Sequence, residues 1–126
     1  MTGCRYGDHR DLLVWQKAMD LACKVHHATA GFPRTEAFGL TSQIRRASVS
    51  IPSNIAEGSA RRTTAELVSF LYIARGSQAE LYTQLQLSAR FGYLSPASVE
   101  PLLAANAEIG RLLTSFLSTL RRRLTR

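Results

Sequence analysis

Apolar residues recur along this chain at intervals of three and four, which is the spacing of one face of an α-helix. Four segments carry this pattern, and no segment alternates apolar and polar residues over a useful length, so we expect an all-α fold. Short connections between long helices predict an antiparallel up-and-down four-helix bundle in a single domain. The expected helices span residues 11–30, 36–58, 64–91 and 96–124.

The second expected helix contains a proline in its middle. Pro52 has no N–H to donate to the carbonyl of Ser48, and its ring disfavours helical geometry at the preceding residue. We therefore predict a kink or a break near Ser50, with short polar side chains binding the freed carbonyls. Gly58 is expected to end this helix, because glycine is the usual residue just past a helix.

The third expected helix has more apolar surface than one core requires. Thr63 or Thr64 is expected to cap it, and Thr63 with Glu66 three residues later fits a capping box. Beside the main apolar stripe, a second set lies about 100° further round the helix, which favours a second neighbour such as another subunit. This candidate subunit interface consists of Val68, Tyr72, Ala79 and Tyr82.

Polar residues on the second and third helices form a candidate structural motif. They could form an interior hydrogen-bond network that pairs with Arg45 or Arg46, fixes the register between the helices and stabilises the bent helix. A role in binding is the alternative. The motif, with the residues of the bend, consists of Gln43, Ser50, Pro52, Asn54, Glu57, Gly58 and Glu80, and Gln84 is expected beside it. Asn106 on the fourth helix is interpreted as a register residue.

The net charge of +7, from 16 basic and 9 acidic residues, indicates a partner rich in phosphate or carboxylate. A general bias of the sequence towards arginine is the competing explanation. Arginine binds phosphate with two hydrogen bonds more readily than lysine does, and Lys17 and Lys24 are the only lysines. The arginines near the C-terminus would also complement the helix dipole. The candidate nucleic-acid ligands are Arg45, Arg46, Arg61, Arg62, Arg75, Arg121, Arg122 and Arg123.

No motif of a known reaction centre occurs in the sequence, so we expect neither an enzyme nor a cofactor. Cys4 and Cys23 are too few for a zinc site, and the adjacent His26 and His27 point in different directions on a helix, so no metal is expected. The apolar stretches are shorter than a membrane span, and the N-terminus lacks a signal-peptide run. We expect a cytoplasmic protein without membrane contact.

Four segments resemble the hallmark segments of a known family. They are residues 10–18, 38–47, 50–58 (Ser-Ile-Pro-Ser-Asn-Ile-Ala-Glu-Gly) and 70–77. These segments are similar to those of the four-helix-bundle proteins encoded in intervening sequences of bacterial large-subunit (23S) rRNA genes. The resemblance implies a cytosolic bundle that assembles as a homopentamer. A related branch, the accessory proteins of diversity-generating retroelements, is a basic pentamer that binds nucleic acid and a reverse transcriptase.

Two functions are open at this point. The first is a non-enzymatic oligomeric module that binds RNA, or DNA, through phosphate contacts that do not read the base sequence. The second is a scaffold that docks another protein without touching nucleic acid, with its arginines in salt bridges. Arginines gathered on one exposed face would favour the first function. Burial of Arg45 and Arg46 against Glu57 and Glu80 would favour the second.

Overall fold

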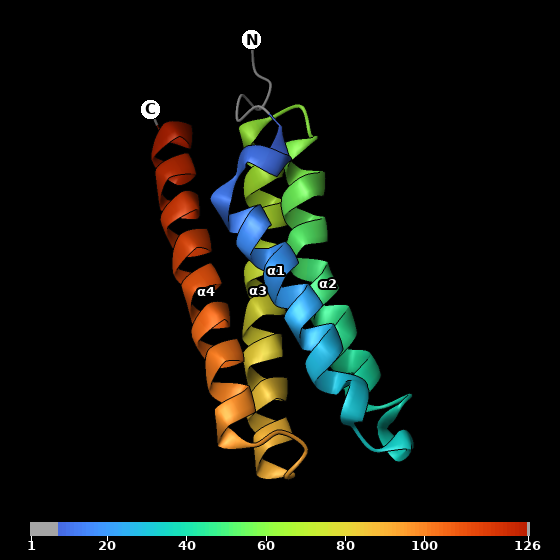
Figure 1. Cartoon of the computed structure of the whole chain (residues 1–126). Helices are drawn as coiled ribbons and strands as arrows, with labels where there is room; N and C mark the ends of the chain where they lie inside the picture. Colours follow the sequence, from blue (N-terminus) through green and yellow to red (C-terminus); the bar gives the residue numbers. More distant parts are fainter. Residues whose placement is uncertain (1–7, 126) are drawn as a thin grey trace.

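The computed structural model describes residues 8–125, and within this range it contains α-helices and 3-10 turns but no strand (Figure 1). The all-α prediction is therefore confirmed. The four long helices are α1 (Leu13–Ala28), α2 (Leu40–Ser59), α3 (Thr64–Arg90) and α4 (Pro96–Leu124). The short 3-10 helices are η1 (His9–Asp11), η2 (Thr29–Gly31) and η3 (Arg34–Glu36). No helix among the described residues is long and apolar enough to cross a membrane.

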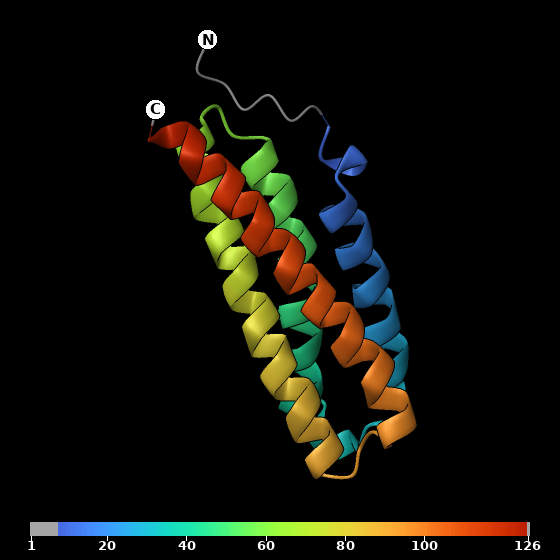
Figure 2. The same ribbon diagram turned by 90° about the vertical axis from the view of Figure 1, so that its left-hand side faces the viewer.

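Each long helix packs against two others. The α2 helix contacts α1 and α3, and α4 contacts the same two helices from the other side. Figures 1 and 2 show that the chain direction alternates from one helix to the next. The α2–α3 connection and the end of α4 consequently lie at the same end of the molecule (Figure 1).

The core runs along the space enclosed by the four helices. Every long helix contributes fully buried aliphatic side chains, for example Leu21, Ile55, Leu71 and Leu113. Burial of this apolar surface is the main force that holds the helices together. Val68 also belongs to this core, since it is only 8% exposed. Its assignment to a subunit interface is therefore wrong, because Val68 packs against the other helices of its own chain.

The α2 helix passes through Pro52 without interruption, so the predicted break near Ser50 does not occur. The proline removes one hydrogen bond, whereas the buried Ile51 and Ile55 hold both halves of the helix against the core. Asn54 Nδ2 donates to the Ser50 carbonyl at 2.8 Å, which is not the Ser48 carbonyl that Pro52 frees, so the expected partner of the freed carbonyl stays a prediction. The kink itself stays a prediction.

The sequence predicted that α2 ends at Gly58, but it does not. Gly58 lies inside the last turn, and the helix ends at Ser59 with Ala60 as the C-cap. A Cβ atom at Gly58 would lie 2.7 Å from Phe70 Cβ and 3.1 Å from Leu67 Cδ1. Glycine is thus required here for the close approach of α2 to α3.

The ends of the other helices are held by side chains. Thr63 caps α3 as predicted, since its Oγ1 accepts the Glu66 N–H at 3.2 Å. The α2 helix begins at Leu40, later than the predicted residue 36, because Glu36 lies in η3 and binds the Leu40 N–H at 3.2 Å. Tyr93 donates its hydroxyl to the same carboxylate at 2.8 Å, which raises the pKa of Tyr93. Glu36 therefore joins the α1–α2 connection to the turn before α4.

Candidate nucleic-acid interface

The structure separates the predicted arginine ligands into several places, and Arg45 is occupied within the fold. Its Nε donates to Thr29 Oγ1 at 2.9 Å, and its Nη2 donates to the His26 carbonyl at 3.3 Å. These bonds fasten α2 to the end of α1. Arg45 is therefore not a candidate phosphate ligand, in contrast to the sequence-based prediction.

The predicted interior polar network does not form. Gln43, Glu57 and Glu80 are exposed at the edge of the α2–α3 contact, because their helical positions turn them towards solvent. Gln84 is buried, and its Oε1 has no hydrogen-bond partner among residues 8–125. Arg45 binds Thr29 instead of Glu57 or Glu80. Arg46 is exposed and lines the same hollow as Glu80, but among residues 8–125 no ion pair joins the two, so the buried arrangement that would favour a scaffold is not seen.

Part of the motif instead surrounds a shallow hollow between α2 and α3. Its volume is about 400 Å³. Ser50 and Ser77 share a hydrogen bond of 2.8 Å at its base and so connect the two helices. The hollow is lined by Gln43, Arg46, Ala47, Ser50, Ser77 and Glu80. With one arginine and one glutamate, it has no excess of positive charge.

Arginines gather at the end of the molecule where α2 joins α3 and where α4 finishes (Figure 1). Arg61 and Arg62 lie in the α2–α3 connection, and residues 121–123 are in the last turn of α4. The Arg61 guanidinium lies 3.9 Å from the Glu57 carboxylate and 4.7 Å from the centre of the Phe70 ring. Arg62 is exposed. We call this region the arginine-rich end.

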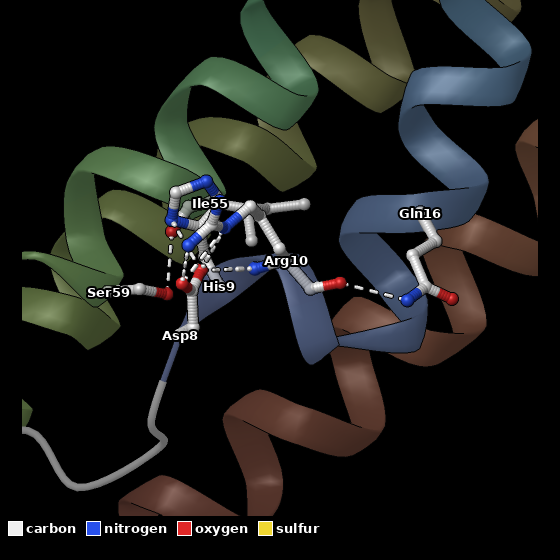
Figure 3. Close-up of polar contacts among 6 residues, drawn as sticks. All are labelled: Asp8, His9, Arg10, Gln16, Ile55 and Ser59. Atoms are coloured by element: carbon white, nitrogen blue, oxygen red, sulfur yellow. Dashed lines mark hydrogen bonds and ion pairs between the residues drawn. The ribbon is translucent and has the colours of Figure 1, made fainter.

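The segment before α1 also reaches this end (Figure 3). Asp8 accepts hydrogen bonds from the backbone and side chain of Arg10, which lowers the pKa of Asp8. Gln16 Nε2 donates to the Arg10 carbonyl at 2.8 Å and connects the segment to α1. Arg10 is therefore neutralised by its own neighbour and adds little to the positive surface. Cys4 lies outside the described residues.

A groove lined by four arginines lies between α3 and α4. It consists of two adjoining hollows of about 350 and 700 Å³ that share Thr114, Ser118 and Arg122. We call it the α3–α4 groove. No carboxylate is among its described lining residues, which carry guanidinium, hydroxyl and amide groups. They are Tyr72, Arg75, Gln78, Tyr82, Ala107, Gly110, Arg111, Thr114, Ser115, Leu117, Ser118, Arg121, Arg122 and Thr125.

Two reciprocal hydrogen bonds hold the helices on either side of this groove. Gln78 Nε2 donates to the Asn106 carbonyl at 3.2 Å, and Asn106 Nδ2 donates to the Gln78 carbonyl at 3.1 Å. Asn106 is fully buried; the second bond satisfies its Nδ2, whereas its Oδ1 has no hydrogen-bond partner among residues 8–125. A Cβ atom at Gly110 would lie 3.0 Å from the Gln78 side chain. Asn106 therefore joins α4 to α3, and its role in setting the register stays a prediction.

The positive charge of the groove is not neutralised by ion pairs within the described residues. The ion pairs among the described residues lie outside the groove lining. They join Asp8 to His9 and Arg10, Lys17 to Glu108, and Arg61 to Glu57. Glu108 lies one turn before Arg111, but its carboxylate contacts Lys17 of α1 at 2.6 Å. This hydrogen bond is the main reason why the pKa of Glu108 is lowered, and the positive charge of Arg111 lowers it further, so Glu108 balances part of the charge of Arg111. The groove therefore offers an anion several guanidinium groups.

Sequence reasoning found Arg75, Arg121 and Arg122 but missed two other arginines of this surface. Arg111 lines the groove itself, and Arg90 lines a third hollow of about 360 Å³, which begins at Tyr82. The signal for Arg111 was present: Arg111, Ser115, Ser118 and Arg122 recur at helical spacing and therefore share one face of α4. Only the packing of α3 shows that this face borders a groove.

The comparisons with known proteins agree with this architecture. The family model of the 23S rRNA-intervening sequence protein matches residues 10–115. A similar solved structure is a protein of unknown function from the S23 ribosomal protein family of Bacteroides thetaiotaomicron. It is 25% identical in sequence and has a TM-score of 0.76, with 83% of this chain and 98% of that chain covered. Among curated proteins, none matches the chain.

Proposed function

The chain belongs to the family of 23S rRNA-intervening sequence proteins, and from this premise we propose that it is a non-enzymatic module that binds nucleic acid, with RNA as the expected class. The observation that carries the proposal is the α3–α4 groove. Arg75, Arg111, Arg121 and Arg122 line it, and no carboxylate is among its described lining residues. A groove of this charge suits a polyanion.

The chemistry of the groove suits phosphate in particular. A guanidinium group donates two parallel hydrogen bonds to phosphate oxygens, and hydroxyl groups such as those of Thr114 and Ser118 donate further ones. Each neutralised phosphate releases condensed counterions, which favours binding at low salt. Contacts of this kind position the nucleic acid without reading its sequence. The arginine-rich end extends the same positive surface beyond the groove.

Binding should therefore depend strongly on salt and weakly on sequence. We expect labelled RNA oligonucleotides of unrelated sequence to bind with similar affinity, with log K falling linearly against log salt concentration. Fluorescence anisotropy at several salt concentrations measures both properties. If RNA and DNA both fail to bind at low salt, the scaffold function replaces this proposal. The exposed Ile73 and Leu87 on α3 would then be the surface to test for a protein partner.

We also propose that the module is a homo-oligomer, and the family resemblance implies a pentamer. Several apolar side chains of α3 remain exposed in the single chain, among them Ile73 at 52% and Leu87 at 37%. Burial of such side chains against another subunit would stabilise an assembly. Ala79 of the predicted interface is exposed as well. Tyr72 and Tyr82 of the predicted interface are also exposed, and both line the α3–α4 groove.

Light scattering tests the assembly. We expect a mass of about 70 kDa, which corresponds to five chains of 13.9 kDa. The variant Ile73→Glu should shift the mass towards that of one chain, because it places a charge on the surface proposed to be buried. A wild-type mass of one chain at micromolar concentration would contradict the proposal.

A further inference from the structure

The α3–α4 groove carries two aromatic rings as well as its arginines. Tyr72 is 37% exposed and Tyr82 is 44% exposed, so a substantial part of each side chain is open to solvent. They lie ten residues apart on the same helix, which corresponds to about 15 Å along its axis. Both residues line the groove. Phosphate binding alone gives no reason for rings at these two places.

Each ring has a polar neighbour. The Arg75 guanidinium carbon lies 5.0 Å from the centre of the Tyr72 ring, within the range of a cation–π contact. The Tyr82 hydroxyl accepts a hydrogen bond from Gln86 Nε2 at 3.1 Å. Such contacts restrict how the rings turn while their exposed parts remain available. A partly ordered, partly exposed ring is a suitable platform for a flat aromatic group.

We propose that the α3–α4 groove takes a single strand of nucleic acid, whose bases stack on Tyr72 and Tyr82 while its phosphates meet the neighbouring arginines. This inference rests on the proposed function and specifies its substrate class. Combining a positive groove with aromatic platforms is how proteins bind single strands without sequence preference. In a duplex, by contrast, the faces of the bases are covered by their neighbours and cannot reach the rings.

The dimensions of the groove agree with a single strand. Its two hollows, of about 350 and 700 Å³, have the size of sites that enclose small molecules, and each could take nucleotide-sized groups. Thr114, Ser118 and Arg122 border both hollows, so a strand can pass from one to the other. Because the rings are about 15 Å apart along α3, they contact bases that are not consecutive, one near Arg75 and the other near Arg111.

A second copy of the chain is a less favourable occupant of the same groove. It would bury Arg75, Arg111, Arg121 and Arg122 against a chain whose own net charge is +7, so most of that surface lacks the opposite charge. Burying a charge without a partner is costly. A nucleic acid brings the opposite charge along its whole length. Charge complementarity therefore favours the strand.

Paired substitutions at the two tyrosines test the inference. The double variant Tyr72→Leu with Tyr82→Leu keeps apolar side chains but removes both rings, whereas Tyr72→Phe with Tyr82→Phe keeps the rings. Phe91→Leu removes a ring that is 55% exposed outside the groove and serves as a matched control. Anisotropy is measured with single-stranded RNA, single-stranded DNA and a hairpin duplex, and light scattering follows the mass of every variant.

We expect the leucine variant to bind single strands about tenfold more weakly, because stacking on a ring is lost. The phenylalanine variant and Phe91→Leu should bind like the wild type. The hairpin should bind the wild type more weakly than a single strand does, and its binding should change little in the leucine variant, which has no rings to lose contact with. Separate RNA and DNA arms show whether the sugar matters. Equal binding of the hairpin and the single strand would overturn the inference while leaving phosphate binding intact.

Other results overturn it in recognisable ways. If the leucine and phenylalanine variants bind single strands as the wild type does, the rings do not stack on bases. If the leucine variant changes mass while its binding is unchanged, the groove is a subunit contact. If the wild type binds neither single strands nor the hairpin, the proposed function fails together with this inference.

Discussion

Replacing Arg75, Arg111 and Arg122 together with glutamine is expected to weaken binding of single-stranded RNA by on the order of one hundredfold at low salt. All three line the α3–α4 groove. An exposed charge pair contributes up to about 1 kcal/mol, so removing three of them costs about 3 kcal/mol, or about two factors of ten in affinity. The weakening should be similar for unrelated sequences, since phosphate contacts do not read bases.

The salt dependence gives a second measure of the same interactions. For single strands, the slope of log K against log salt falls by about 0.7 for each phosphate that the protein no longer neutralises, so removing three arginines should flatten it by about 2. The control variant replaces Lys24, Arg34 and Arg46 with glutamine. These residues are exposed and lie outside the groove, and the net charge falls by the same amount. Equal weakening in both variants would mean that total charge, rather than the groove, governs binding.

Gly58→Ala is expected to destabilise the chain, although alanine is the better helix former. The new Cβ atom would lie 2.7 Å from Phe70 Cβ, an atom held close to the α3 backbone. The helices must move apart to make room. Overpacking of this kind costs about 1–3 kcal/mol of stability. The gain in helix propensity, about 1 kcal/mol, offsets only part of this cost.

Gly76→Ala is the matched control for this substitution. Gly76 lies inside α3, and a Cβ atom there meets nothing within 4 Å. The same change should therefore stabilise the helix by up to about 1 kcal/mol. We expect the free energies of unfolding of the two variants to differ by about 2 kcal/mol in denaturant titrations, with light scattering to separate effects on assembly. Similar stability for both variants would show that α2 and α3 can separate at Gly58 without cost.

The sequence by itself determined which segments are helical and where several of them begin. The third and fourth helices were expected at residues 64–91 and 96–124, and they span Thr64–Arg90 and Pro96–Leu124. Thr63 caps its helix as predicted. These features depend on residues within one or two helical turns of each other, so a local pattern is sufficient to predict them. The total charge was likewise evident without a structure.

Only the tertiary structure decided what each helical face contacts. Val68 was expected outside the bundle but lies in its core, and Gly58 was expected to end α2 but allows α3 to approach. Arg45 was a candidate ligand but holds α1, whereas Arg111 was missed although it lines the groove. Helical periodicity shows which residues share a face of a helix. Whether that face is buried, borders a groove or is open to solvent depends on the distance and rotation of the neighbouring helix. These are set by packing between residues far apart in the chain.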